Sequence, residues 1–317
     1  MTRFAALALA AGLAGCSPVS AADVDASSDA TTPLADARVD AQHADGSPDA
    51  ATSCRSIDPF DSFAPVAGIK TTAAEQNAWL SHDELTVIFG RFTPGRKNDF
   101  FIASRAVRTD AFANVRPLSE LNSLDQEYRA FMSDDGLNIF FDRQDSSTGY
   151  HILTAVRSSP AAQFGAAAPV ASVNDMGGNY EPFLTPEGMY LGSERGGNLS
   201  DLFLAPRVGA GFGAPVRLGV SSSAPEEMPV VSSDGLTLYF AARDRDPAGQ
   251  SWDVWMATRA DLGQPFSAAA LVNASNGMIN QAGRDIPAWI SDDDCRLYYT
   301  TDRDGDLDVW VASRTPH

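Results

Sequence analysis

The sequence predicts an all-β fold in which one four-stranded unit of about 50 residues occurs five times. Three observations carry this prediction. A turn motif recurs five times, a strand that ends in Arg follows every copy, and the last copy stops three residues before the C-terminus without its fourth strand. Self-similarity at a period of this length indicates a repeat architecture whose units pack against one another.

The first two strands of the unit flank a polar turn, as in residues 131–137 (FMSDDGL). An apolar pair, a turn with Asp-Gly or an equivalent, and an apolar restart are typical of a β-hairpin. The Ser or Thr of this motif recurs at intervals of 52, 52, 47 and 59 residues. The five copies span residues 79–85, 131–137, 183–189, 230–236 and 289–295.

The second strand is rich in β-branched and aromatic residues and ends near an Arg in every copy. The third strand has a frame of seven residues that ends in Arg, such as Asp253–Arg259. A fourth, weaker strand comes next, such as Phe164–Val170. Four strands in about 50 residues are typical of a propeller blade, so we predict a five-bladed β-propeller of four-stranded blades. The Arg residues after the second strand are Arg91, Arg143, Arg195, Arg243 and Arg303.

The N- and C-terminal ends of the chain are expected to share the closing blade. The last unit lacks a fourth strand, and the segment Phe63–Ile69 resembles one. Pairing it with the last strand, Asp308–Arg314, closes the ring and removes exposed sheet edges. Cys54 lies just before this segment and Cys295 begins the second strand of the last unit, so we predict a disulfide between them. The alternative is two free thiols, with Cys295 buried as a small apolar side chain.

The unit is similar to the WD-like repeat of TolB-type propellers. The likeness is greatest in Leu236–Phe240 and Asp253–Trp255, and it extends over about residues 60 to 314. It implies the propeller fold, on which binding modules, lectins, hydrolases and protease gates all occur. TolB-type proteins carry a helical domain before the propeller and usually have six blades, whereas this sequence has five units.

Residues 1–15 have the pattern of a lipoprotein signal peptide. A basic start at Arg3 precedes an apolar run, Phe4–Leu13, that is too short to span a bilayer. The segment 13–16 (LAGC) resembles the bacterial lipobox, which implies that Cys16 is acylated and becomes the mature N-terminus. More than one acyl chain would anchor the protein firmly. The alternative is an ordinary export signal with a chance Cys.

Residues 16–57 are expected to form a disordered tether, and residues 58–317 the propeller domain. The tether is rich in Ala, Asp, Ser and Thr, so it cannot bury enough apolar surface to become ordered. The formal net charge of −18 argues against a nucleic-acid partner and against peripheral contact with anionic lipid. We expect a monomer in the bacterial cell envelope, lipid-anchored at the outer membrane and facing the periplasm or the exterior.

Acidic residues near the start of each first strand are the candidate binding residues. In a propeller this segment lies near the channel mouth, so the acids would hold a polar or cationic ligand, or a cation. The alternative pairs each acid with the Arg after the second strand, as ion pairs between blades. Both series recur in equal number, which favours the structural alternative, because a ligand site usually breaks symmetry. The acids are Glu75, Glu127, Glu181, Glu226 (followed by Glu227) and Asp285.

The remaining motifs predict no metal site, cofactor or catalytic residue. The acids of Asp302–Asp308 alternate as in a calcium loop, but no downstream bidentate Glu follows. Residues 209–214 resemble a dinucleotide fingerprint without its helix, and none of the four His has triad or metal spacing. Aromatic residues at equivalent positions, such as Trp79 and Phe131, are expected to pack between blades.

We therefore expect a non-catalytic scaffold that binds an envelope protein or a cell-wall component without a cofactor. The alternative is a carbohydrate-binding or glycoside-hydrolysing propeller. This alternative predicts asymmetrically placed aromatic residues and at least two carboxylates outside the repeat register. A structure in which every acid pairs with an Arg, and in which nothing at the axis breaks the symmetry, would eliminate it.

Overall fold

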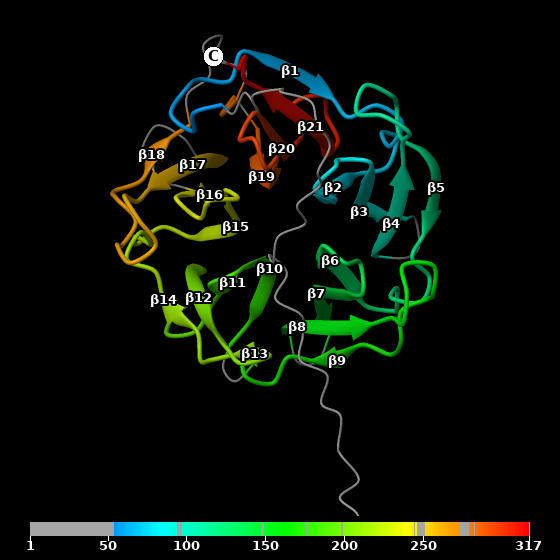
Figure 1. Cartoon of the computed structure of the whole chain (residues 1–317), viewed down its shortest axis with the longest axis horizontal. Helices are drawn as coiled ribbons and strands as arrows, with labels where there is room; N and C mark the ends of the chain where they lie inside the picture. The colour runs from blue at the N-terminus through cyan, green and yellow to red at the C-terminus, as the bar shows by residue number, and fades with distance from the viewer. Residues whose placement is uncertain are drawn as a thin grey trace, which may run out of the picture. The chain divides into compact units, whose positions relative to one another are not determined.

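The computed structural model describes residues 54–93, 97–146, 149–174, 177–197, 199–243, 245, 251–272, 279–281 and 283–316. Every regular element in this part of the chain is a β-strand, and the strands form five sheets arranged as propeller blades (Figure 1). The predicted five-bladed propeller is therefore confirmed. The signal peptide, the acylated Cys16 and nearly all of the tether lie outside the described residues. No membrane-spanning helix occurs among the residues that the structure describes.

Each blade is an antiparallel sheet whose first strand lies nearest the ring axis (Figure 1). Blade 1 consists of β2 (Glu75–Leu80), β3 (Thr86–Phe92), β4 (Asn98–Ser104) and β5 (Ala113–Pro117). Blade 2 consists of β6 (Gln126–Met132), β7 (Asn138–Asp145), β8 (Gly149–Val156) and β9 (Ala168–Pro169). Blade 3 consists of β10 (Asn179–Thr185), β11 (Gly188–Ser193) and β12 (Asp201–Val208), with β13 (Gly211–Phe212) and β14 (Val216–Arg217) sharing the outer position.

The last two blades follow the same order. Blade 4 consists of β15 (Glu226–Val231), β16 (Thr237–Arg243), β17 (Trp252–Thr258) and β18 (Ala270–Leu271). Blade 5 consists of β19 (Asp285–Ile290), β20 (Arg296–Thr301), β21 (Asp308–Ser313) and the first strand of the chain, β1 (Ser62–Pro65).

A repeated hydrogen-bond pattern shapes the turn between the first and second strands. In blade 2 the Ser133 hydroxyl donates to Asp135 Oδ1 (2.6 Å) and accepts from the Asn138 amide (2.9 Å). Gly136 completes the turn with a φ of +67°, which favours glycine. We call this end of the propeller the turn end, and the opposite end, where the inner strands begin, the strand-start end. The same two bonds recur at Ser81, Ser232 and Ser291.

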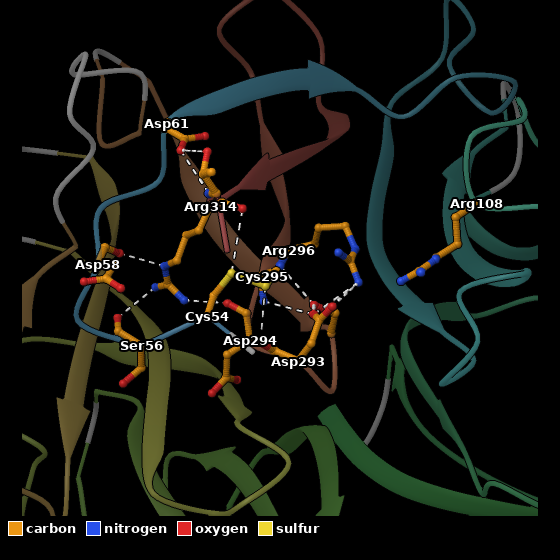
Figure 2. The surroundings of a disulfide bond; sticks show 12 residues. Cys54, Ser56, Asp58, Asp61, Arg108, Asp293, Asp294, Cys295, Arg296 and Arg314 are labelled. Atoms are coloured by element: carbon orange, nitrogen blue, oxygen red, sulfur yellow. Dashed lines mark hydrogen bonds and ion pairs between the residues drawn. A yellow bond between two sulfur atoms is a disulfide. The ribbon is translucent and has the colours of Figure 1, made fainter. Parts of the chain in front are cut away.

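Both ends of the chain complete blade 5. The predicted pairing of segment 63–69 with the last strand is confirmed, because β1 pairs with β21 over four residues. The structure joins Cys54 to Cys295 by a disulfide (Figure 2). Beside it, Arg314 Nε donates to the Asp58 carbonyl at 2.7 Å. The segment before β1 is thus fixed to the closing blade by a covalent bond and by a charged hydrogen bond.

The hydrophobic core extends through all five blades and across the axis. The Trp289 ring centroid lies 5.7 Å from Trp79, 5.7 Å from Phe131 and 5.8 Å from Phe183. These residues come from the inner strands of four blades, and Val230 takes the same position in the other. The aromatic residues predicted to pack between blades therefore meet at the axis, toward the turn end.

Candidate functional site

The acids at the start of the inner strands form buried ion pairs within their own blades. The structural alternative stated from the sequence was a set of ion pairs between neighbouring blades. The pairs lie instead within single blades, because each partner Arg lies on or just after the second strand of the same sheet. In blade 4 the partner is Arg245, where Arg243 was expected. The pairs are Glu75–Arg91 (2.8 Å), Glu127–Arg143 (2.8 Å), Glu226–Arg245 (3.1 Å) and Asp285–Arg303 (3.0 Å).

These ion pairs also hold the loop that leads into each inner strand. Glu75 Oε1 accepts from the Thr71 hydroxyl at 2.5 Å, and Arg91 Nη2 donates to a carbonyl of the same loop at 2.7 Å. Glu127 and Ser123 repeat the first contact at 2.6 Å. Because the same contacts recur around the ring, we assign them to the frame of the propeller and not to a ligand site.

Glu181 does not belong to this series. In blade 3 the equivalent position is occupied by Asn179, whose side-chain oxygen accepts from Arg195 Nη2 at 2.7 Å. Glu181 lies two residues further along β10. The sequence interpretation placed Glu181 among the strand-start acids because it is the nearest acid to a position that carries an amide in this blade. The Asn179–Arg195 hydrogen bond replaces the ion pair and leaves Glu181 outside the repeat.

Every inner strand contains a register irregularity just after its start. A β-bulge at such a point turns a side chain out of the regular alternation, and bulges are frequent beside functional sites. Three of the residues concerned have a positive φ, including Glu181 at +62°. Because the inner strands surround the axis, the bulge residues are grouped near it. They are Asn77, Arg129, Glu181, Met228 and Ala288.

Arg129, Asp142, Glu181 and Glu227 form a charged group near the strand-start end of the axis, which we call the axial cluster. Asp142 Oδ1 accepts from the backbone amides of Arg129 and Glu181, each at 3.1 Å. Arg129 Nη2 donates to the Ala288 carbonyl at 2.7 Å, so a side chain of blade 2 reaches the inner strand of blade 5. This contact across the ring places the guanidinium at the axis.

The two glutamates of the axial cluster are bound to blades 3 and 4. Glu181 Oε2 accepts from the Met228 amide at 2.5 Å, which links β10 to β15. Glu227 Oε1 accepts from the Ser200 hydroxyl at 3.0 Å. Glu181 is buried and Glu227 is partly exposed, so the two carboxyl groups have unlike environments.

Burial changes the proton affinities of the axial cluster. It raises the pKa of Asp142 to about 7, and backbone hydrogen bonds to the carboxylate only partly oppose this. Burial also raises the pKa of Glu181 well above its usual range, and the charges of Glu227 and Asp142 raise it further. Burial lowers the pKa of Arg129 to about 10. A carboxyl group that keeps its proton near neutral pH can act as a general acid.

The carboxyl groups of the axial cluster are not repeated around the ring, although the bond from the Glu181 amide to Asp142 has a counterpart in the bond from the Asn77 amide to Thr300 Oγ1 (3.1 Å). The position of Asp142 is occupied by Gly, Ala or Thr in the other blades, and that of Glu227 by Gln, Tyr or Ile. Asp142 Oδ2 is buried and has no hydrogen-bond partner within the described ranges. The axis therefore carries three carboxyl groups outside the repeat register. Of these, Glu181 was chosen from the sequence as a strand-start acid and Glu227 was noted beside Glu226, whereas Asp142 was not singled out.

Three tyrosines that the sequence did not single out lie beside the axial cluster. The Tyr150 ring centroid lies 5.7 Å from Tyr128 and 5.2 Å from Tyr180. Tyr128 and Tyr150 belong to blade 2 and are partly exposed, whereas Tyr180 belongs to blade 3 and is buried. A search for residues that break the repeat, in place of those that follow it, would have found them.

At the turn end, His82 joins three blades. Its Nδ1 lies 2.7 Å from Asp292 Oδ2, and its Nε2 lies 2.6 Å from Asp134 Oδ1. These two hydrogen bonds raise the pKa of His82 to about 10. Both ring nitrogens are occupied by acids of neighbouring turns, so His82 is a clamp between blades.

The acidic loop 302–308 makes ion pairs with a lysine. Lys70 Nζ lies 2.6 Å from Asp308 Oδ2 and 3.1 Å from Asp304 Oδ2. Within the described ranges, no group of three or more His, Cys, Asp or Glu is arranged to hold a metal ion. In residues 209–214, the two-residue strand β13 pairs with β12, and no helix begins there.

No protein-family model matches the chain, and no curated protein matches its sequence. Its fold is similar to that of a thermostable family-43 glycoside hydrolase, with a TM-score of 0.53 and 13% identity over 78% of this chain and 90% of that one. It is also similar to the catalytic domain of the Coprinopsis cinerea GH62 α-L-arabinofuranosidase, with a TM-score of 0.52 and 12% identity over 83% of this chain and 98% of that one.

TolB from Acinetobacter baumannii is a further structural neighbour, with a TM-score of 0.45 and 14% identity. The match covers 78% of this chain, which spans 57% of the length of that TolB. A putative TolB from Agrobacterium tumefaciens is also among the structural neighbours, with a TM-score of 0.47 and 14% identity. A low sequence identity accompanies all four similarities, so they describe the fold and not the activity.

The expectation of a non-catalytic protein has to be corrected. It rested on the absence of a recognisable catalytic motif and on an axis whose charges all follow the repeat. Glycoside hydrolases share this fold, and three carboxyl groups at the axis lie outside the repeat register. Neither the fold nor the axis supports the exclusion of catalysis.

Proposed function

We propose that this protein binds a carbohydrate at the strand-start end of its axis and hydrolyses a glycosidic bond there. The observation that carries the proposal is the axial cluster, in which Asp142, Glu181 and Glu227 break the fivefold repeat around one buried guanidinium. A charged group found in every blade would stabilise the propeller, whereas a charged group found once at the axis is suited to binding a ligand there.

Glycoside hydrolysis requires two carboxyl groups in unlike environments, one that donates a proton to the leaving oxygen and one that acts as a base or nucleophile. Glu181 fits the first role, because burial and the neighbouring charges of Glu227 and Asp142 raise its pKa well above the usual range and so favour the protonated form. Glu227 fits the second role, because it is partly exposed and is oriented by Ser200. Asp142 is buried and positions the backbone of Arg129 and Glu181 by accepting their amides.

The structural neighbours support this reading at the level of the fold. Their names describe enzymes that act on glycosides, and one of them is an α-L-arabinofuranosidase. The proposal for this chain depends on its own residues, and the shared scaffold makes the chemistry compatible with the fold.

We further propose that the propeller is held in the bacterial envelope through an acylated Cys16, at the outer membrane and facing the periplasm or the exterior. Support comes from the lipobox-like segment 13–16 and the Asp-rich segment that follows it. The ligand would then be a glycan of the cell wall or its surroundings, met by a monomeric propeller. Labelling with radioactive palmitate should be lost in Cys16→Ala, and retained label would contradict the anchor.

A second candidate function is contact with an envelope protein at the same end of the ring. Leu124, in the loop before β6, is 93% exposed, and Phe92 and Leu199 are also exposed near this end. A contiguous patch of exposed apolar side chains marks a site of protein contact, and these three residues are the candidates for such a patch at this end. Cross-linking to an envelope protein should be lost in Leu124→Asp, and an unchanged cross-linking pattern would count against this surface.

The test of the primary proposal is a hydrolysis assay of the purified protein against aryl glycosides and oligosaccharides. We expect turnover of at least one substrate, and a loss of about 100-fold or more in Glu181→Gln, because a general acid contributes roughly that much. The matched control is Glu127→Gln, a buried acid of the repeated series. A protein that turns over no glycoside, or a Glu181→Gln variant of full activity, would overturn the catalytic proposal.

A further inference from the structure

The three tyrosines beside the axial cluster form one continuous row. Their centroid separations of 5.7 and 5.2 Å, with interplanar angles of 44° and 63°, place the rings in tilted and edge-to-face contact. Such contacts hold aromatic rings in fixed positions. The row crosses from blade 2 into blade 3, and its two members in blade 2 keep part of their surface exposed.

The tyrosine row ends at the axial cluster. Tyr128 directly precedes Arg129 in β6, and Tyr180 directly precedes Glu181 in β10. Burial is the largest cause of the raised pKa of Tyr150, and Tyr128 is the next. The charges of Asp142 and Glu181 raise this pKa further, so both acids lie close enough to Tyr150 to interact with it electrostatically. A molecule resting on the exposed rings of Tyr128 and Tyr150 would have its other end directed toward the axis.

Glycines in blade 3 make room for the innermost ring of the row. A Cβ added to Gly192 would lie 2.6 Å from Tyr180 Cε2, and one added to Gly178 would lie 3.5 Å from Tyr180 Cε1. Only a glycine at position 192 allows this ring position, because real Cβ atoms do not approach so closely. The ring is thus seated against the backbone of β11.

The complete row of three tyrosines occurs once among the described blades, although Tyr128 and Tyr180 occupy the same repeat position in blades 2 and 3. The position of Tyr150 in the third strand is taken by Asn98, Ser200, Trp252 and Leu307 in the other blades. A packing device would recur around the ring, as the strand-start ion pairs do. The row crosses from blade 2 to blade 3, where Asp142 of the axial cluster also contacts Glu181, so both break the symmetry at this boundary.

We propose that Tyr128, Tyr150 and Tyr180 form a stacking subsite for a neutral sugar residue of the ligand. The inference rests on the proposed carbohydrate function and names its substrate class. The apolar face of a sugar ring packs on aromatic rings, while its hydroxyl groups bond to the polar groups of the axis. A uronic acid is disfavoured, because its carboxylate would be brought near Glu227, and Arg129, the cation of the cluster, already donates to the Ala288 carbonyl and the Met228 sulfur.

Isothermal titration calorimetry on the full-length protein tests the subsite, with xylotriose, cellotriose and chitotriose as neutral probes and trigalacturonic acid as the anionic one. We expect binding of a neutral trisaccharide and at least about tenfold weaker binding of the anionic one. Tyr150→Ala should weaken neutral binding about tenfold or more, whereas Tyr150→Phe, which keeps the ring, should stay within about twofold of wild type. Trp252→Ala, the equivalent position in blade 4, is the matched control and should bind as wild type does.

The outcomes separate the subsite from the proposed function. If neutral glycans bind, Tyr150→Ala weakens them and no substrate is hydrolysed, the subsite stands and the catalytic proposal falls. If hydrolysis is found and Tyr150→Ala binds as wild type does, or Tyr150→Phe binds as poorly as Tyr150→Ala, the subsite is wrong. Stronger binding of trigalacturonic acid than of every neutral probe would overturn the substrate class. Thermal unfolding of each variant distinguishes lost stacking from lost folding.

Discussion

Two sets of charged residues lie on the first strands of the blades and on or just after the second strands, and they differ in whether the ring repeats them. The strand-start ion pairs recur in four blades, with an amide–Arg bond in the remaining one, and each pair holds the loop before its own strand. The axial cluster occurs once, although it starts only one or two residues further along the same strands. Residues that recur from blade to blade stabilise the propeller, whereas residues that occur in one place indicate its function.

The comparison between the strand-start ion pairs and the axial cluster predicts the largest effect, a loss of hydrolysis, for a substitution of Glu181. Glu181→Gln keeps the acceptor for the Met228 amide but cannot release a proton. We expect hydrolysis to fall by about 100-fold or more, with the midpoint of thermal unfolding within a few degrees of wild type. Steady-state kinetics and circular dichroism on the same preparation check this.

The opposite pattern is expected for the strand-start acids. Glu127→Ala removes one partner of a buried ion pair and leaves the Arg143 guanidinium, which is largely buried, without its carboxylate. We expect a loss of about 3–5 kcal/mol in the free energy of unfolding. Denaturant titration measures it, with the exposed loop residue Asp110→Ala as the control. A free energy of unfolding equal to that of the control would show that Glu127 does not stabilise the propeller.

The disulfide belongs to the frame as well, because it fixes the segment before β1 to the closing blade (Figure 2). Cys295→Ser should lower the free energy of unfolding by about 2–4 kcal/mol. Adding reductant should then destabilise wild type by a similar amount and leave the variant unchanged. A wild-type protein that is indifferent to reductant would show that the ring closes without this bond.

Asp142 allows a test of the axial cluster through pH. Its pKa of about 7 in the folded protein lies above the value of 3.8 for an exposed Asp, so the folded state holds the proton more tightly. The contribution of this proton to the free energy of unfolding is complete below pH 4 and is lost as the pH rises through 7. The free energy of unfolding falls by about 1.4 kcal/mol for each pH unit in which only the folded state keeps the proton. Asp142→Asn should make this decline between pH 4 and 7 less steep in denaturant titrations, and Glu181, whose pKa is also raised, accounts for part of the decline that remains. A variant whose stability falls as steeply as that of wild type would rule Asp142 out as its source.

The smallest effect is expected at the turn end. His82 has a raised pKa of about 10, so its contribution to stability is complete below pH 6.5 and is lost as the pH rises through 10. The three side chains are partly exposed, and screening by solvent limits the contribution to about 1 kcal/mol. His82→Asn should lower stability by this amount at pH 7 without changing glycan binding. A variant that loses glycan binding but keeps its stability would place the ligand site at the turn end.

The fold was predictable because its signals are local and repeated. Ser133, Asp135 and Gly136 form a turn whose bonds are complete within six residues, and the missing fourth strand of the last unit predicted the pairing of β1 with β21. The axial cluster was not predictable in this way. Asp142 lies in the middle of a second strand, and its contacts to Arg129 and Glu181 depend on the closure of the ring and on bulges that no turn signal marks.

The measurement that tests the central claim most directly is a crystal structure of Glu181→Gln with a bound neutral trisaccharide. We predict a sugar ring against Tyr128 and Tyr150, with a glycosidic oxygen next to the side chain of residue 181. A trisaccharide bound at the turn end, or an axis without any sugar at saturating concentration, would contradict the assignment of the axial cluster to a ligand.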